Sequence, residues 1–141
     1  MSNKQVVRRW FEEVWNKHDA SAIDRMFARE RVSHGLPIDG NDLAGPERFR
    51  AFHERFIQAF PDLELVIDDL IEEDDRVAAR WHCTGTLTGN GLGVPPNGRR
   101  MSVSGMSVIR VESGYIVEAW NNFDWLGMHR QLGTLAALAA V

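Results

Sequence analysis

The 141-residue sequence predicts an α+β fold, in which a curved and mainly antiparallel sheet is wrapped around three N-terminal helices. Apolar residues recur with helical spacing before Pro61, whereas after it they alternate with polar residues, as in half-buried strands. Turn-forming residues separate the alternating segments. Because the length suits a single hydrophobic core, we expect residues 1–141 to form one domain.

The helical half begins with residues 2–16, where apolar side chains stand four residues apart at Val6, Trp10 and Val14. Arginines and glutamates occupy the opposite face of this segment, so the spacing predicts an amphipathic helix. Asp19 follows and can cap a second, shorter helix.

The next boundary is marked by glycine and proline. Residues 31–34 are too few to assign, and residues 35–45 are rich in Gly, Pro, Asn and Asp, which indicates a loop. Pro46 then suits the first turn of a third helix, because the missing N–H has no partner there in any case. This helix ends at Pro61.

The second half of the chain predicts four strands and a last helix. Residues 63–67 and 77–83 alternate apolar and polar side chains on either side of a charged turn. After a Gly- and Pro-rich loop, Met101–Val111 and Tyr115–Phe123 form a second pair of strands, joined at a Ser-Gly turn. Trp125–Leu132 has a helical pattern.

Composition excludes several classes of partner. The formal net charge is −4, and the Lys and Arg residues are scattered among acids, so we expect no nucleic-acid binding. No run approaches the roughly 20 apolar residues of a membrane span, and no apolar signal core follows Met1, which predicts a cytoplasmic protein without membrane contact. The lone Cys83 is given no role.

Aromatic side chains are concentrated in the first and third helices. They provide enough apolar surface to line a cavity as well as to fill a core, and the helical spacing alone is compatible with both interpretations.

Five short segments, taken in order, resemble a known family. They are Gly85–Gly89, Leu92–Arg99, Arg110–Gly114, Glu118–Asp124 and Arg130–Gly133. Together they resemble the SnoaL-like polyketide cyclases, often labelled ester cyclases, and the resemblance extends from the first helix to Gly133.

The resemblance implies a cone-shaped barrel of the cystatin-like or nuclear-transport-factor-two-like superfamily, with a deep pocket between helices and sheet. It implies no cofactor, whether metal, nucleotide or flavin, and an apolar or polycyclic small-molecule ligand. Characterised members close the last ring of anthracycline-type polyketides by intramolecular aldol condensation, with an aspartate as acid and base.

The family's catalytic residues are replaced in this sequence. The aspartate falls on Asn121, and the Gln and His of the preceding strand fall on Gly105 and Ser107. None of these three residues can perform the same proton transfer. Trp15, in contrast, matches a position that lines the pocket of the cyclases.

Other residues are therefore candidates for the catalytic roles. Asp124 stands among apolar residues, where desolvation would raise a carboxyl pKa and suit it to general base catalysis, although a helix cap explains it equally well. Asn121 can donate a hydrogen bond to an enolate oxygen, or be satisfied within the sheet. His34 is a candidate polarising group, with a structural role as the alternative.

The candidate substrate-binding residues are mostly aromatic or strand-borne: Trp15, Phe52, Phe56, Arg80, His82, Ser107 and Trp120. The aromatic rings could form flat walls, although helical spacing is also typical of a core. Arg80 stands in an otherwise apolar strand, where its guanidinium requires an anionic ligand group or an acid, such as Asp124. No pair of histidines has ligand spacing, so no metal site is expected.

These observations favour an enzyme with cofactor-free acid/base chemistry, namely aldol cyclisation, isomerisation or dehydration, acting on an apolar cyclic carbonyl compound in a buried pocket. The alternatives are a non-catalytic module that binds a small molecule in the same pocket, and a purely structural dimerisation domain. We also expect a homodimer, because the last two strands carry Val, Met and Ile on both faces.

Overall fold

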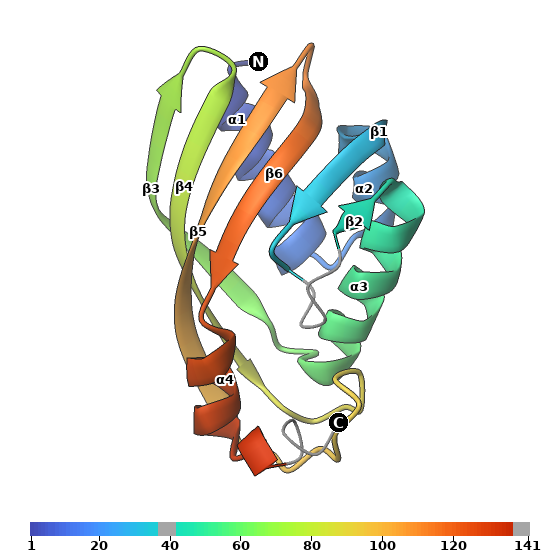
Figure 1. Cartoon of the computed structure of the whole chain (residues 1–141), viewed down its shortest axis with the longest axis vertical. Coiled ribbons are helices and arrows are strands. Elements are labelled where there is room, and N and C mark those ends of the chain that lie inside the picture. Colours follow the sequence, from blue (N-terminus) through green and yellow to red (C-terminus); the bar gives the residue numbers. More distant parts are fainter. Residues whose placement is uncertain (37–41, 137–141) are drawn as a thin grey trace.

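The computed structural model describes residues 1–36 and 42–136. It confirms the α+β class: a curved six-stranded sheet has α1, α2 and α3 against one of its faces (Figure 1). The helices are α1 (Asn3–Trp10), its continuation η1 (Phe11–Asn16), α2 (Ala20–Met26), α3 (Pro46–Ala59) and α4 (Trp125–Leu132). The strands are β1 (Phe27–His34), β2 (Leu43–Ala44), β3 (Glu64–Glu73), β4 (Arg76–Thr86), β5 (Arg100–Glu112) and β6 (Tyr115–Phe123).

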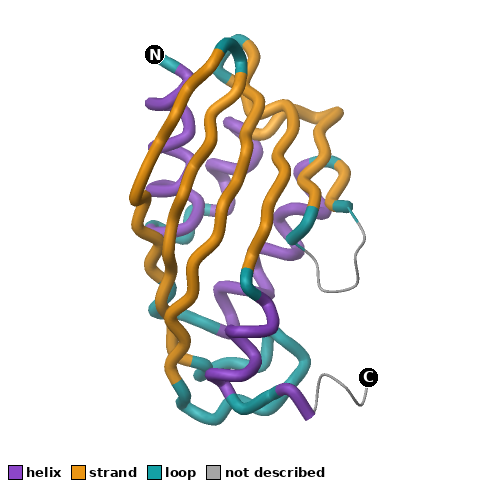
Figure 2. Tube along the Cα trace, turned by 60° about the vertical axis from the view of Figure 1, so that its left-hand side comes forward, coloured by secondary structure: helices purple, strands orange, loops and turns teal. Residues whose placement is uncertain are grey.

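The sheet is mixed but mainly antiparallel, in the order β2-β1-β6-β5-β4-β3. The long strands β3 to β6 form an antiparallel meander, and β1 pairs in parallel with β6, so the chain's first strand lies beside its last (Figure 2). The short strand β2 completes the edge next to β1. The parallel contact brings residues 33 and 34 against residues 119 and 120.

Local signals in the sequence located most element boundaries correctly. Asp19 caps α2 by accepting a hydrogen bond from the Ser21 N–H, and α3 begins at Pro46. The assignment failed at Phe27–His34, which forms β1, and at Leu43–Ala44, which forms β2 within the expected loop. The rest of that loop, residues 37–41, lies outside the described residues.

The first helix is not regular throughout. Its second half, η1, is a π-helix, in which the Lys17 N–H donates to the Glu12 carbonyl five residues earlier, at 2.8 Å. The Val14 carbonyl accepts a hydrogen bond from Nε2 of His53 on α3, at 2.6 Å. His53 and His129, both on helices, are buried, and burial lowers the pKa of each.

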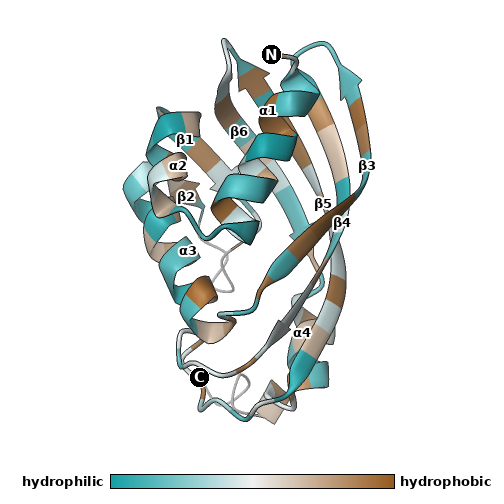
Figure 3. Cartoon of the chain, turned by 180° about the vertical axis from the view of Figure 1, so that it is seen from behind, coloured by the Kyte–Doolittle hydropathy of each residue, from teal (hydrophilic) through white to brown (hydrophobic). Residues whose placement is uncertain are grey.

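The core lies between the helices and the concave face of the sheet. Along β4, Val77, Ala79, Trp81 and Cys83 are buried, and the residues between them are more exposed, so hydrophobic and hydrophilic positions alternate along the strands (Figure 3). Within the described residues, no helix combines the length and the apolar character that crossing a membrane requires.

Candidate ligand-binding cavity

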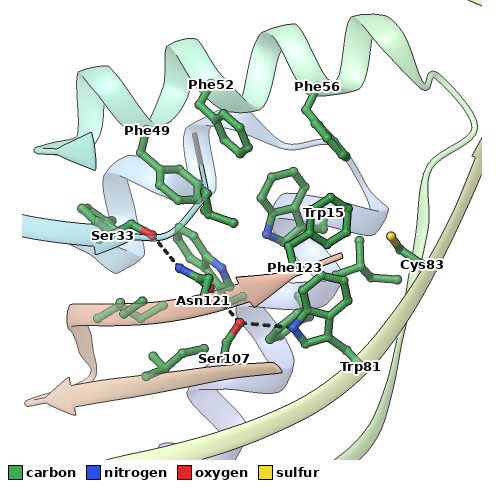
Figure 4. Close-up of a pocket in the computed structure, with 18 of the residues that line it drawn as sticks. Trp15, Ser33, Phe49, Phe52, Phe56, Trp81, Cys83, Ser107, Asn121 and Phe123 are labelled. Atoms are coloured by element: carbon green, nitrogen blue, oxygen red, sulfur yellow. Dashed lines mark hydrogen bonds between the residues drawn. The ribbon is translucent and has the colours of Figure 1, made fainter. Parts of the chain in front are cut away.

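A cavity opens between the helices and the concave face of β4, β5 and β6 (Figure 4). The cavity has a volume of about 60 Å³, several times the roughly 10–15 Å³ that one water needs. Its wall is mainly aromatic: Trp10, Phe11, Trp15, Phe27, Phe49, Phe52, Phe56, Trp81, Phe123 and Trp125. The polar residues in the wall are Ser33, Ser107 and Asn121.

These three residues come from different strands and form one hydrogen-bonded cluster. Ser107 on β5 lies opposite Asn121 on β6, and its hydroxyl donates to Asn121 Oδ1 at 2.7 Å. Asn121 Nδ2 donates to Ser33 Oγ at 3.0 Å and to the His34 carbonyl at 2.8 Å. The parallel pairing of β1 with β6 is what brings Ser33 and His34 within reach.

Trp81 completes the cluster from β4, because its indole Nε1 donates to Ser107 Oγ at 3.1 Å. This contact depends on Gly105, which pairs with Trp81 across the strands. A Cβ at position 105 would lie 2.4 Å from the Trp81 ring, so only glycine leaves room for the indole. Neither Trp81 nor Ser33 was a candidate from the sequence, although a glycine inside a strand signals such close approach.

The wall has little capacity for proton transfer. Among the described residues that line the cavity, none is Asp, Glu, His, Lys or Arg. Cys83 also lines it, but burial raises the pKa of the thiol to about 12, so it stays protonated at neutral pH. The cavity can therefore hold an apolar molecule and offer it neutral hydrogen bonds.

The prediction that Asp124 acts as a base in the pocket is wrong. Its side chain is exposed and caps α4, where Oδ1 accepts a hydrogen bond from the Gly127 N–H at 2.9 Å. The carboxylate is not part of the cavity wall. The alternative that the sequence left open, a helix cap, is the one that the structure confirms.

His34 and Trp120 also point away from the cavity, because each is the strand neighbour of an inward residue. The His34 ring lies between two carboxylates, with Nε2 2.7 Å from Glu118 and Nδ1 3.0 Å from Asp42. The hydrogen bond with Glu118 raises the pKa of His34. The ring stacks on Trp120, and Arg76 lies over that indole, so Trp120 is not a wall of the cavity.

Arg80 and His82 are on the same outer face of the sheet and do not line the cavity. Arg80 Nε donates to Asp69 at 2.7 Å, and His82 Nδ1 is 2.9 Å from Asp68. Arg80 thus has acidic partners, but Asp124 is not one of them. The prediction that they bind substrate in the pocket is wrong, because neither side chain lines the cavity.

The remaining candidates lie where the sequence predicted them. Trp15, Phe52, Phe56, Ser107 and Asn121 are in the cavity wall, and their contact with a ligand stays a prediction. Trp15 is presented by η1 and packs 5.1 Å from the His53 ring. In the part of the chain that is described, no group of three or more His, Cys, Asp or Glu side chains could hold a metal ion.

Known proteins of similar sequence and structure identify the family of this chain. A family model described as SnoaL-like polyketide cyclase matches residues 5–132. Aklanonic acid methyl ester cyclase DauD of Streptomyces sp. strain C5 is 30% identical over 130 residues, covering 91% of this chain and 80% of that protein. TsrD from Streptomyces laurentii is 32% identical with a TM-score of 0.79, covering 94% of this chain and 95% of that one.

A protein with a ketosteroid isomerase-like fold from Catenulispora acidiphila has a TM-score of 0.75 at 17% identity, covering 91% of this chain and 92% of that one. At this identity the likeness shows the fold alone.

Proposed function

Because this chain belongs to the SnoaL-like polyketide cyclase family, we propose that it binds an apolar cyclic carbonyl compound of the polyketide kind in the cavity and polarises its carbonyl group. The observation that carries the proposal is the wall itself, whose described residues are mainly aromatic and otherwise apolar, apart from Cys83 and one neutral cluster of Ser33, Ser107 and Asn121. Flat aromatic walls suit a flat ring system, and a few convergent polar groups suit one oxygen on it.

Polarisation is the catalytic contribution that these residues can make. A hydrogen bond to a carbonyl oxygen strengthens as negative charge develops in an enolate, more so in a site that excludes water. The adjacent C–H becomes more acidic, which assists aldol cyclisation, isomerisation or dehydration without a cofactor. The proton then passes to another atom of the substrate, in an aldol cyclisation to the oxygen that becomes the new hydroxyl group, since no described side chain of the wall accepts one at neutral pH.

The second candidate is a non-catalytic binding module with the same ligand class. The observation in its favour is the absence of any Asp, Glu or His among the described residues of the wall. Binding and turnover separate the two functions.

Aklanonic acid methyl ester is the compound to test first, since the relative DauD is named a cyclase for it. Binding would quench tryptophan fluorescence, because Trp10, Trp15, Trp81 and Trp125 line the cavity. Turnover would appear as a cyclised product in chromatography. Binding with turnover supports the enzyme, binding without turnover supports the module, and no binding would contradict this ligand class for both.

We also propose a homodimer that packs through the outer face of the sheet. Met106 and Val108 on β5 are 53% and 37% exposed, and Trp120 on β6 is only half-buried opposite Val108. An apolar patch of this kind favours coverage by a second copy. Sedimentation should show a dimer that Met106→Lys converts to monomer, whereas a wild-type species of 16.0 kDa at micromolar concentration would contradict the proposal.

A further inference from the structure

The hydrogen bonds of the cavity cluster run in one direction, because both ends are fixed. The indole N–H of Trp81 can only donate, and the backbone carbonyl of His34 can only accept. The amide nitrogen of Asn121 must therefore face His34, which leaves its oxygen facing Ser107. Ser107 accepts from Trp81 and has one hydrogen, which it donates to Asn121 Oδ1.

The fixed orientation of the Asn121 amide also determines which hydrogen bonds the Ser33 hydroxyl makes. The second N–H of Asn121 Nδ2 points at Ser33 Oγ, which accepts it at 3.0 Å. The hydrogen of the Ser33 hydroxyl is then left over, and no acceptor among the described residues takes it. Ser33 is only 1% exposed and lines the cavity, so a molecule in the cavity is the available partner.

We propose that the Ser33 hydroxyl donates a hydrogen bond to the carbonyl oxygen of the ligand, and that Ser33 makes the cavity select ketones over hydrocarbons of the same shape. The proposal rests on the proposed function, because it assumes that the ligand occupies this cavity. Three hydrogen bonds lead in series from Trp81 through Ser107 and Asn121 to Ser33. Such a series strengthens the last donor, the Ser33 hydroxyl, cooperatively.

The other two polar residues of the wall cannot substitute for this donor. The O–H of Ser107 and both side-chain N–H groups of Asn121 are already donated within the cluster. Their oxygens keep spare lone pairs, which would accept from a ligand hydroxyl but not bind a ketone. Within the cluster, a ketone oxygen therefore finds its donor at Ser33.

A pair of matched probes tests this inference: 1-tetralone carries one ketone oxygen, and tetralin has the same two rings without it. Their dissociation constants for the full chain can be measured by calorimetry. We expect 1-tetralone to bind roughly three- to tenfold more tightly, as one neutral hydrogen bond predicts. Ser33→Ala should bring the ratio of the two constants close to one.

Two further variants serve as controls. Ser104→Ala makes the same change on the exposed face of β5 and should keep the wild-type ratio. Ser33→Thr retains the hydroxyl and should keep the ketone preference, and circular dichroism checks that each variant folds. Equal binding of both probes to the wild type, or an unchanged ratio in Ser33→Ala, would overturn the role of Ser33 alone. Failure of both probes to bind the wild type would overturn the cavity's proposed function as well.

Discussion

Replacing Asn121 with aspartate puts a carboxyl group at the centre of the hydrogen-bonded cluster. The amide nitrogen that donates to Ser33 and to the His34 carbonyl becomes an oxygen. Ser33 can turn its hydroxyl to donate to that oxygen, but the carbonyl of His34 cannot. Two acceptors would face each other at about the present distance of 2.8 Å unless the new carboxyl is protonated.

The structure sets the size of the effect. The new carboxyl would lie in a mainly aromatic cavity with no described cation in its wall, and both burial and the facing carbonyl favour its neutral form. A pKa raised by about two to three units corresponds to roughly 3–4 kcal/mol between the protonated and ionised forms. With a midpoint change of about 3–4 °C per kcal/mol, the melting temperature at high pH should fall by roughly 10 °C.

The sign of the pH dependence follows from linkage. The folded-state pKa of the new carboxyl lies above its unfolded value of about 3.9, so the folded state holds more protons between the two. The penalty is therefore absent below about pH 4, grows as the pH rises, and is complete above the folded-state pKa. The Asn121→Asp variant should approach the wild type in acid and be clearly less stable at pH 8.

Urea denaturation at pH 4.5 and pH 8 measures this difference. Asn122→Asp is the matched control, since Asn122 is the next residue of β6 but is exposed. A carboxyl there keeps its water, so the control should lose little at either pH. An equal loss of unfolding free energy in both variants at pH 8 would show that the buried cluster does not raise the pKa of the new carboxyl.

Asp124→Asn should keep the cap of α4 and change stability by less than about 0.5 kcal/mol, whereas Asp124→Ala should cost about 1 kcal/mol in thermal melts. Trp81→Phe should cost about 1 kcal/mol more than Trp125→Phe, because the buried indole N–H of Trp125 has no partner among the described residues. The Glu118 hydrogen bond raises the pKa of His34 above 6.5. The stability that this bond gives the folded protein should therefore be complete below pH 6.5 and lost as the pH rises through the folded-state pKa. His34→Gln should remove that part of the pH profile of the melting temperature.

The fold could be predicted where the signal is local. Asp19, Pro46 and the change of period after Pro61 mark element boundaries within a few residues of sequence. Strand β1 could not be assigned in this way, because its main partner, β6, is more than 80 residues away. The π-helix was not predicted either, and one of its carbonyls, that of Val14, accepts a hydrogen bond from His53 on another helix.

In the site, too, positions could be predicted where strand alternation was visible and not where the strand itself was unassigned. Strand alternation along β6 puts Ala119, Asn121 and Phe123 on one face, and all three line the cavity. The same alternation excludes Trp120, whose aromatic character outweighed its position in the prediction. For His34 no register was available, because a strand that has not been assigned has no predicted inner face.

The neutral cavity is the result of several residues that depend on one another, and not of Asn121 alone. Gly105 admits the Trp81 ring, the Trp81 N–H fixes the hydroxyl of Ser107, and that hydroxyl orients the amide of Asn121 toward the His34 carbonyl. Each member satisfies a polar atom of the next, so a carboxylate at position 121 would meet a carbonyl that it cannot bind. Asn121→Asp alone therefore creates a strained, proton-holding group, and an ionised base at this position would also require a donor in place of the His34 carbonyl.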